Sequence, residues 1–172
     1  HVNGWTADGF NAALQFDKDP SRLFISDQQG AFIERSSELG LQDNNQGRGI
    51  VCFDFDRDGD VDIFTANSEQ APALFRNDGG NLNNYLHIQV EGEQKNTEAI
   101  GARVDVTIND TIQMRELQVS NNFMSQNPVE VYFGLGNANN VDQVRDVWPS
   151  GQERTLENVS INQLLFVQHP LN

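Results

Sequence analysis

Hydrophobic residues along the chain fall in short runs separated by Gly, Asn, Asp and Pro. No stretch shows the sustained i, i+3, i+4 spacing of an amphipathic helix, whereas apolar-rich runs of about four to eight residues bounded by turn formers are typical of strands. The pattern therefore predicts an all-β fold, with a helical turn only at residues 36–41. The predicted strands span residues 23–26, 31–35, 49–54, 62–67, 73–76, 85–90, 102–108, 112–119, 129–133, 144–148 and 164–168.

Several of these runs alternate apolar and polar positions. Leu86, Ile88 and Val90 face one side of their predicted strand, and His87 lies on the opposite, polar side. Similar alternation recurs in the predicted strands that begin near residues 102 and 129. Because successive side chains of a strand point to opposite faces, this pattern predicts sheets with one buried and one wetter face.

Two segments of the first half resemble each other. Residues 22–30 and 73–80 both contain a Leu-Phe pair, a polar pair and a turn with Gly, and their leucines, Leu23 and Leu74, lie 51 positions apart (74 − 23 = 51). This period is close to the roughly 40 to 50 residues of a propeller blade, but a closed propeller needs about four to eight blades. The repeat therefore predicts a partial β-propeller-like region, with upstream propeller blades expected in the same parent chain.

A turn-rich stretch at residues 77–84 marks a change in composition. Clusters of Gly, Asn and Asp between patterned segments are typical of loops. We therefore predict two domains. Residues 1–82 are expected to form a repeat region with one partial and one near-complete unit, and residues 83–172 a small antiparallel β domain.

The chain is strongly acidic, with 25 Asp and Glu against 11 Lys and Arg and a formal net charge of −14. A negative field of this size repels nucleic-acid phosphates and anionic lipid, and it attracts cations. No apolar run approaches the roughly 20 residues that a membrane-spanning helix needs. We therefore expect no nucleic-acid partner and no insertion into a membrane.

A run of alternating aspartates is the strongest chemical signal in the chain. Residues 54–62 read Asp-Phe-Asp-Arg-Asp-Gly-Asp-Val-Asp, with Gly59 at the sixth position. Ca²⁺ takes six to eight oxygen ligands, and Gly permits the sharp reversal that wraps such a loop around an ion. The sequence thus predicts a Ca²⁺ site, in which the residue at position 60 contributes its backbone carbonyl and the others their carboxylates. The predicted metal-binding residues are Asp54, Asp56, Asp58, Asp60 and Asp62.

This loop differs from an EF-hand. An EF-hand places a bidentate Glu at position 12, which is Thr65 in this chain, and its flanks are helical, whereas residues 50–53 and 63–64 are strand-like. The prediction is a calcium loop between two strands. An acidic, solvated hairpin turn without an ion is the alternative.

These residues resemble two known families. The segments 47–50, 54–62 and 63–67, with 74–77, resemble the FG-GAP/VCBS repeat, and residues in the second half resemble the ASPIC/UnbV domain. The resemblance implies a calcium-bearing partial propeller followed by a small β domain, in an extracellular or periplasmic protein. It implies no reaction. The residues that carry the second resemblance are 100–104, 125–127, 133–136 and 147–152.

Catalytic motifs are absent from the sequence. It contains no G-x-S-x-G, no H-E-x-x-H and no phosphate-binding Gly loop. A loop that saturates its ion also leaves no coordination position for a substrate. We therefore expect a noncatalytic calcium-binding extracellular module for adhesion or recognition of a protein or carbohydrate ligand, rather than an enzyme. One alternative is an accessory region of a larger secreted enzyme that acts on polysaccharide, and another is a structural end-cap of a propeller.

Overall fold

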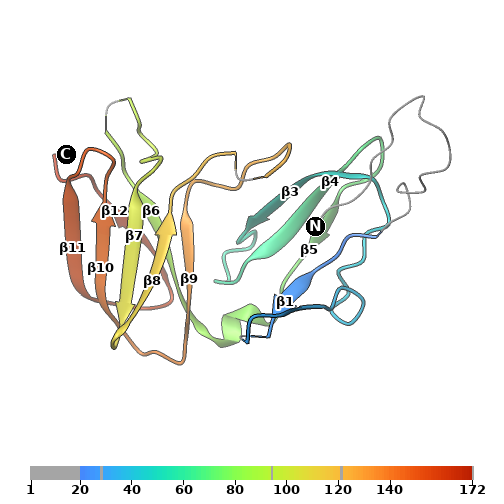
Figure 1. Cartoon of the computed structure of the whole chain (residues 1–172), viewed down its shortest axis with the longest axis horizontal. Helices are drawn as coiled ribbons and strands as arrows, with labels where there is room; N and C mark the ends of the chain where they lie inside the picture. Colours follow the sequence, from blue (N-terminus) through green and yellow to red (C-terminus); the bar gives the residue numbers. More distant parts are fainter. Residues whose placement is uncertain (1–19, 28, 94, 121, 172) are drawn as a thin grey trace. The chain divides into compact units, whose positions relative to one another are not determined.

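The fold is all-β, as the hydrophobic pattern predicts (Figure 1). The computed structural model describes residues 20–171 except 28, 94 and 121. Its helical content within these residues is one short 3-10 turn, Gly80–Leu82, and no described helix is long and apolar enough to cross a membrane. The described residues form small separate sheets and no propeller.

Each predicted strand has a counterpart. The strands are β1 (Phe24–Ser26), β2 (Phe32–Glu34), β3 (Gly47–Phe53), β4 (Asp62–Asn67), β5 (Ala73–Phe75), β6 (Asn84–Val90), β7 (Arg103–Ile108), β8 (Thr111–Glu116), β9 (Val131–Gly136), β10 (Val141–Val147), β11 (Glu153–Val159) and β12 (Gln163–Val167). The sequence pattern missed β11. This strand lies at the edge of its sheet and buries only Val159, so its sequence carries no apolar run.

The chain divides into two compact units that are interleaved along the sequence. Unit 1 comprises the described residues up to Cys52 together with Asp62–Arg76 and Asn122–Gln126. Unit 2 comprises Phe53–Val61, Asn77–Asn121 and the described residues from Asn127 onward. The loop between β3 and β4 therefore belongs to unit 2. The predicted domains 1–82 and 83–172 are contiguous halves, and that division stays a prediction.

Unit 1 contains the β1–β2 hairpin and a three-stranded sheet in the order β3-β4-β5. The segment Asn122–Gln126 is bonded to β3, because Asn122 Nδ2 donates to the Ile50 carbonyl at 2.9 Å and the Ser125 hydroxyl accepts from Ile50 N at 2.9 Å. Every residue of β1 and β2 is exposed. The buried side chains among the described residues of this unit are polar. They include Asp43 and Thr65, whose Oγ1 donates to the Asp43 carboxylate at 3.0 Å.

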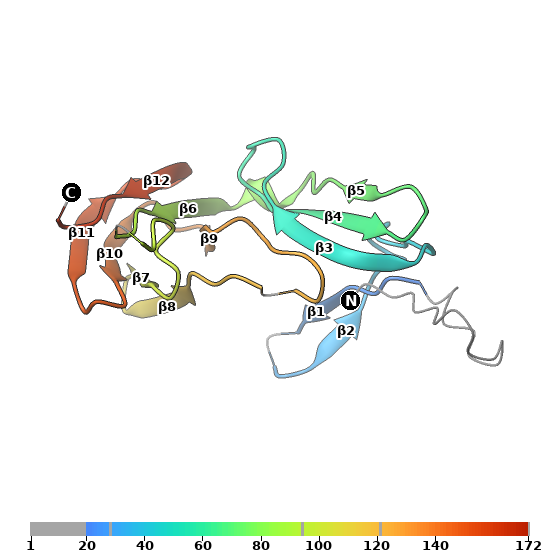
Figure 2. The ribbon, with the colours of Figure 1, turned by 90° about the horizontal axis from the view of Figure 1, so that it is seen from above.

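Unit 2 is built from two sheets that appear as layers in Figure 2. One is antiparallel, in the order β11-β10-β7-β8, and the other has the order β12-β6-β9, with β12 parallel to β6. Alternate residues of β6, β7, β9 and β10 point inward and form one hydrophobic core, as in other two-layer β folds. Trp148 follows β10 in this core. It is 2% exposed, and its Nε1 donates to the Glu91 carbonyl at 2.8 Å.

Candidate metal centre

The aspartate loop is shaped by two residues with positive φ. Arg57 has φ 61° and Gly59 has φ 103°, so the backbone reverses at the position where the sequence predicts a turn. Gly59 is also required sterically, because a Cβ at this position would lie 2.0 Å from Cε1 of Tyr85. Glycine therefore supplies both the conformation and the close approach to the tyrosine ring.

Hydrogen bonds within the loop fix its curled conformation. The two carboxylate oxygens of Asp54 accept from the backbone N–H groups of Asp58 at 3.1 Å and Gly59 at 3.0 Å. A carboxylate oxygen of Asp58 accepts from Asp60 N at 3.2 Å. Side chains that accept from backbone N–H groups a few residues ahead stabilise turns of this kind.

Three of the predicted ligands lie together. Asp54, Asp56 and Asp58 each offer a carboxylate oxygen, and these oxygens lie within 4.8 Å of one another. Asp54 and Asp58 are half-buried, and Asp56 is exposed. Two carboxylates about 4 Å apart repel by roughly 4 kcal/mol at an effective dielectric near 20, and a cation would reverse that repulsion. An all-oxygen set of this charge suits a hard divalent cation, so the cluster could bind a metal.

The remaining two predicted ligands, Asp60 and Asp62, are not part of this group of three carboxylates. Asp60 is 5% exposed, and its Oδ2 accepts from Gly80 N at 3.0 Å. Asp62 is fully buried and is the first residue of β4, in unit 1. Coordination of an ion by all five aspartates therefore stays a prediction.

The loop packs on the outer face of β6 and β9. His87 and Tyr132 are paired across these strands, with ring centroids 4.1 Å apart, and the ring of Tyr85 lies 4.9 Å from that of His87. Nδ1 of His87 is 3.7 Å from a carboxylate oxygen of Asp54. The sequence places His87 on a wetter face, but its side chain is buried, because the neighbouring rings and the loop lie against it.

Burial governs the protonation of these aromatic residues. It lowers the pKa of His87, and this effect exceeds the opposing ones of Asp54, Glu130 and the Gly59 carbonyl. The pKa of Tyr132 is raised by burial and by Glu130, which accepts a hydrogen bond from the phenol, while the backbone N–H of Asp54 acts on the phenol oxygen in the opposite sense. His87 thus lies beside the first carboxylate of the aspartate loop, and the ring of Tyr132 packs against His87.

A pocket of about 390 Å³ lies beside the loop within unit 2. Its lining includes Asp60, Tyr85, Tyr132 and Gly134, and it contains no Lys, Arg, Ser or Cys. An anionic ligand would find no charge partner there, and no nucleophilic hydroxyl or thiol of Ser or Cys faces the pocket.

Sequence reasoning missed the three aromatic residues as part of the site. Alternation in residues 85–90 does place Tyr85 and His87 on the same side of β6. Nothing local indicates that this side receives a loop some thirty residues away in the chain. Tyr132 becomes its neighbour only through the β6–β9 register, which pairs His87 with Tyr132.

Comparison with known proteins places the second half of the chain in a family. Residues 92–171 match the family model of ASPIC and UnbV, so this region is an ASPIC/UnbV domain. The match does not include the residues that resemble the FG-GAP/VCBS repeat, and that resemblance stays a prediction.

The chain is also similar to cartilage acidic protein 1 from three animals. It is 27% identical to the mouse protein and 27% identical to the human protein, over 136 residues in each case, or 76% of this chain. It is 38% identical to the Xenopus tropicalis protein over 60 residues, or 34% of this chain. The aligned region spans only 21% of the mouse protein and 20% of the human protein.

Proposed function

With residues 92–171 assigned to the ASPIC/UnbV family, we propose that the chain is a noncatalytic, calcium-binding module of an extracellular or periplasmic protein, acting in adhesion or ligand recognition. The observation that carries this proposal is the group of three carboxylates at Asp54, Asp56 and Asp58. It lies on a loop whose backbone is already curled by its own hydrogen bonds. The function of the calcium is to hold that loop in shape.

Calcium suits this loop better than magnesium. Ca²⁺ accepts six to eight oxygens in flexible geometry, whereas Mg²⁺ demands near-ideal octahedral coordination and retains its waters. The loop offers carboxylates of different exposure on a short curved backbone, which is a flexible donor set. Bound calcium would supply positive charge among these carboxylates.

A noncatalytic role is supported by the surroundings of the loop. The adjacent pocket is lined by no Ser, Cys or Lys, so a nucleophile–base pair with His87 is not available from its lining. A secreted location is supported by the name of the similar animal proteins, which is cartilage acidic protein 1, and by the acidic composition of this chain.

The second candidate is an accessory region of a larger secreted enzyme. It is favoured by the small share of the animal proteins that this chain covers, 21% in the mouse protein. The sequence of the full parent chain separates the two candidates. A catalytic domain in it supports the accessory role, and its absence supports an adhesion or recognition module.

Thermal unfolding tests the metal site. Extracellular calcium modules bind with dissociation constants of roughly 10⁻⁴ to 10⁻³ M, and a tenfold excess of ligand over Kd stabilises by about 1.4 kcal/mol. We expect Ca²⁺ to raise the unfolding temperature relative to EGTA, and Mg²⁺ to have a smaller effect. Asp58→Asn should abolish the difference, whereas the control Asp110→Asn, at the exposed β7–β8 turn, should keep it. Identical curves for the wild-type chain in Ca²⁺ and EGTA would contradict the proposal.

A further inference from the structure

The outer face of β6 and β9 contacts the aspartate loop at its two functional points. One is Gly59, where the backbone reverses, and the other is Asp54, the first carboxylate of the cluster. Tyr85 contacts the first, and His87 and Tyr132 contact the second. All five residues belong to unit 2, so these contacts lie within one compact unit.

The contact at Gly59 is a packing contact. A Cβ on Gly59 would meet Cε1, Cζ and Cδ1 of Tyr85 at 2.0, 2.4 and 2.6 Å, so the tyrosine ring lies directly against the glycine backbone. The ring, rather than the phenol oxygen, makes this contact. Removal of the ring would free the loop to move at its point of reversal.

The contact at Asp54 is polar. Its carboxylate lies 3.7 Å from His87 Nδ1, and its backbone N–H acts on the phenol oxygen of Tyr132. The same carboxylate accepts from the N–H groups of Asp58 and Gly59. Asp54 therefore links His87 on β6 to the backbone of the loop.

We infer that Tyr85, His87 and Tyr132 are positioning residues for the metal-binding loop, so that metal affinity depends on these residues of β6 and β9 and metal binding stabilises the two strands. This inference rests on the proposed function. Three carboxylates held at short range repel one another, and a rigid support that prevents their separation lowers the cost of forming the site when the cation binds. Residues that orient metal ligands typically change metal affinity by 10- to 100-fold when they are replaced.

The same chemical change at two positions gives a matched test. Tyr132→Phe removes the phenol that donates to Glu130 and interacts with the backbone N–H of Asp54, and we expect Ca²⁺ affinity measured by calorimetry to fall about tenfold. Tyr85→Phe keeps the ring that packs on Gly59, and we expect wild-type affinity. Tyr85→Ala should weaken binding by about as much as Tyr132→Phe. Phe166→Ala is the control, because Phe166 lies on β12 of the same sheet, is 55% exposed and is not part of the pocket lining.

Hydrogen exchange supplies a readout that a general loss of stability does not reproduce. In the wild-type chain, Ca²⁺ should slow amide exchange in β6 and β9, and Tyr132→Phe should reduce this protection at a temperature where both proteins are folded. The failures are distinguishable. If the wild-type chain does not bind Ca²⁺, the proposed function fails. If it binds Ca²⁺ but Tyr132→Phe and Tyr85→Ala bind with wild-type affinity, the positioning role is wrong.

Discussion

Two buried aspartates, one in each unit, have opposite surroundings. Asp43 in unit 1 is 5% exposed and accepts hydrogen bonds from Asn45 N at 3.0 Å, Thr65 Oγ1 at 3.0 Å and Asn67 Nδ2 at 2.9 Å. Asp146 in unit 2 is fully buried on the inner face of β10, and its carboxylate oxygens have no hydrogen-bond partner among the described residues. The difference shows that hydrogen bonds, rather than burial, decide whether a carboxylate stabilises its surroundings.

The pKa values of the two groups move in opposite directions. Burial alone would raise the pKa of Asp43, but the hydrogen bonds from Asn67, Asn45 and Thr65 lower it below its usual value. For Asp146, burial raises the pKa to about 7; Arg154 on β11 lowers it, and Asp105 on β7 adds to the increase. The surroundings of Asp43 thus favour an ionised carboxylate, and those of Asp146 favour a protonated one.

Removal of Asp43 should have the largest effect. Asp43→Ala leaves the hydroxyl of Thr65 and the amide of Asn67 without their shared acceptor, and hydrogen bonds to a charged group contribute about 1.5 to 3 kcal/mol each. We expect a loss of roughly 3 kcal/mol, seen as faster amide exchange in β3, β4 and β5. Glu69→Ala, at an exposed position of the same unit, is the control. Unchanged exchange in the variant would show that Asp43 is not a main support of unit 1.

Replacement of Asp146 should increase stability, whereas removal of Asp43 should decrease it. At pH 8 the wild-type carboxylate is ionised in the core, so Asp146→Asn should stabilise unit 2 by about 2 kcal/mol, less than the full effect of the pKa shift because the new amide is also buried. Below pH 4 the gain should vanish. Glu157→Gln, at an exposed position of the same sheet, should give no such gain. A loss of stability at pH 8 in Asp146→Asn would mean that the carboxylate is favourably solvated.

Acid titration of the wild-type chain separates the two units. Asp146 has a folded pKa of about 7 against an ordinary value of 3.8, so its favourable contribution is complete below pH 3.8 and is lost as the pH rises to about 7. Asp43 has a lowered pKa, so its contribution is present above pH 3.8 and is lost as the pH falls through the folded pKa. Amide exchange should therefore slow in unit 2 between about pH 7 and 4, and then quicken in unit 1 at lower pH. A parallel response of both units would contradict the comparison.

The sequence predicts the strands better than it predicts the partners of their side chains. Apolar runs and alternation located β3 to β10, because burial of one face leaves a period of two in the sequence. The same pattern missed β11, an edge strand that pairs with β10 and buries only Val159. Local spacing also identified the cluster at Asp54, Asp56 and Asp58.

Contacts between distant segments leave no pattern in the local sequence that would predict them. Asp43 lies in a loop, and its partners Thr65 and Asn67 are more than twenty residues away. Tyr132 reaches the aspartate loop only because β9 pairs with β6. Asp146 falls within a predicted strand, but alternation alone does not tell whether a lone polar residue on the inner face has found a partner.

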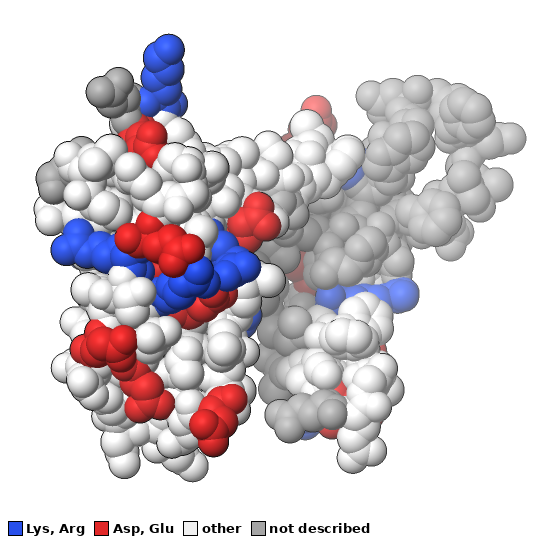
Figure 3. Space-filling view, turned by 60° about the vertical axis from the view of Figure 1, so that its left-hand side comes forward, with Lys and Arg blue, Asp and Glu red and all other residues white. Residues whose placement is uncertain are grey.

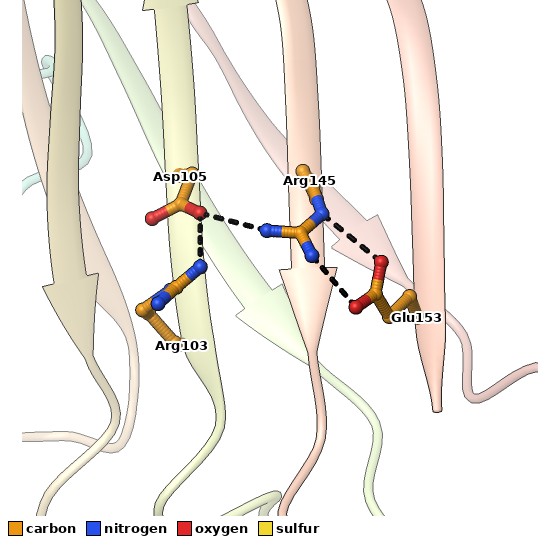
Figure 4. Close-up of polar contacts among 4 residues, drawn as sticks. All are labelled: Arg103, Asp105, Arg145 and Glu153. Carbon is orange, nitrogen blue, oxygen red and sulfur yellow. Dashed lines mark hydrogen bonds and ion pairs between the residues drawn. The ribbon is translucent and has the colours of Figure 1, made fainter. Parts of the chain in front are cut away.

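The outer face of the sheet that contains Asp146 carries paired charges. Figure 3 shows basic and acidic side chains mixed in a band over this unit, and Figure 4 shows four of them in a row. Nη2 of Arg103 donates to Asp105 at 2.9 Å, and Nη1 of Arg145 approaches the same oxygen at 3.4 Å. Arg145 also donates to both carboxylate oxygens of Glu153, at 3.0 and 2.6 Å. One strand, β10, thus presents a paired Arg145 to water and an unpaired Asp146 to the core.

Loss of the Arg145 pairs should have the smallest effect of the set. Exposed ion pairs contribute little, because water and salt screen them and two long side chains lose freedom when they pair. Arg145→Met keeps much of the aliphatic stem and removes the charge, so we expect a small decrease in unfolding temperature at about 0.01 M salt that disappears at about 1 M. Gln143→Met, which removes an uncharged side chain that donates to Glu157, is the matched control and should show little salt dependence. The unfolding temperature could fall more in Arg145→Met than it changes in Asp146→Asn. That result would show that the outer face, rather than the hydrogen bonding of buried groups, controls the stability of this sheet.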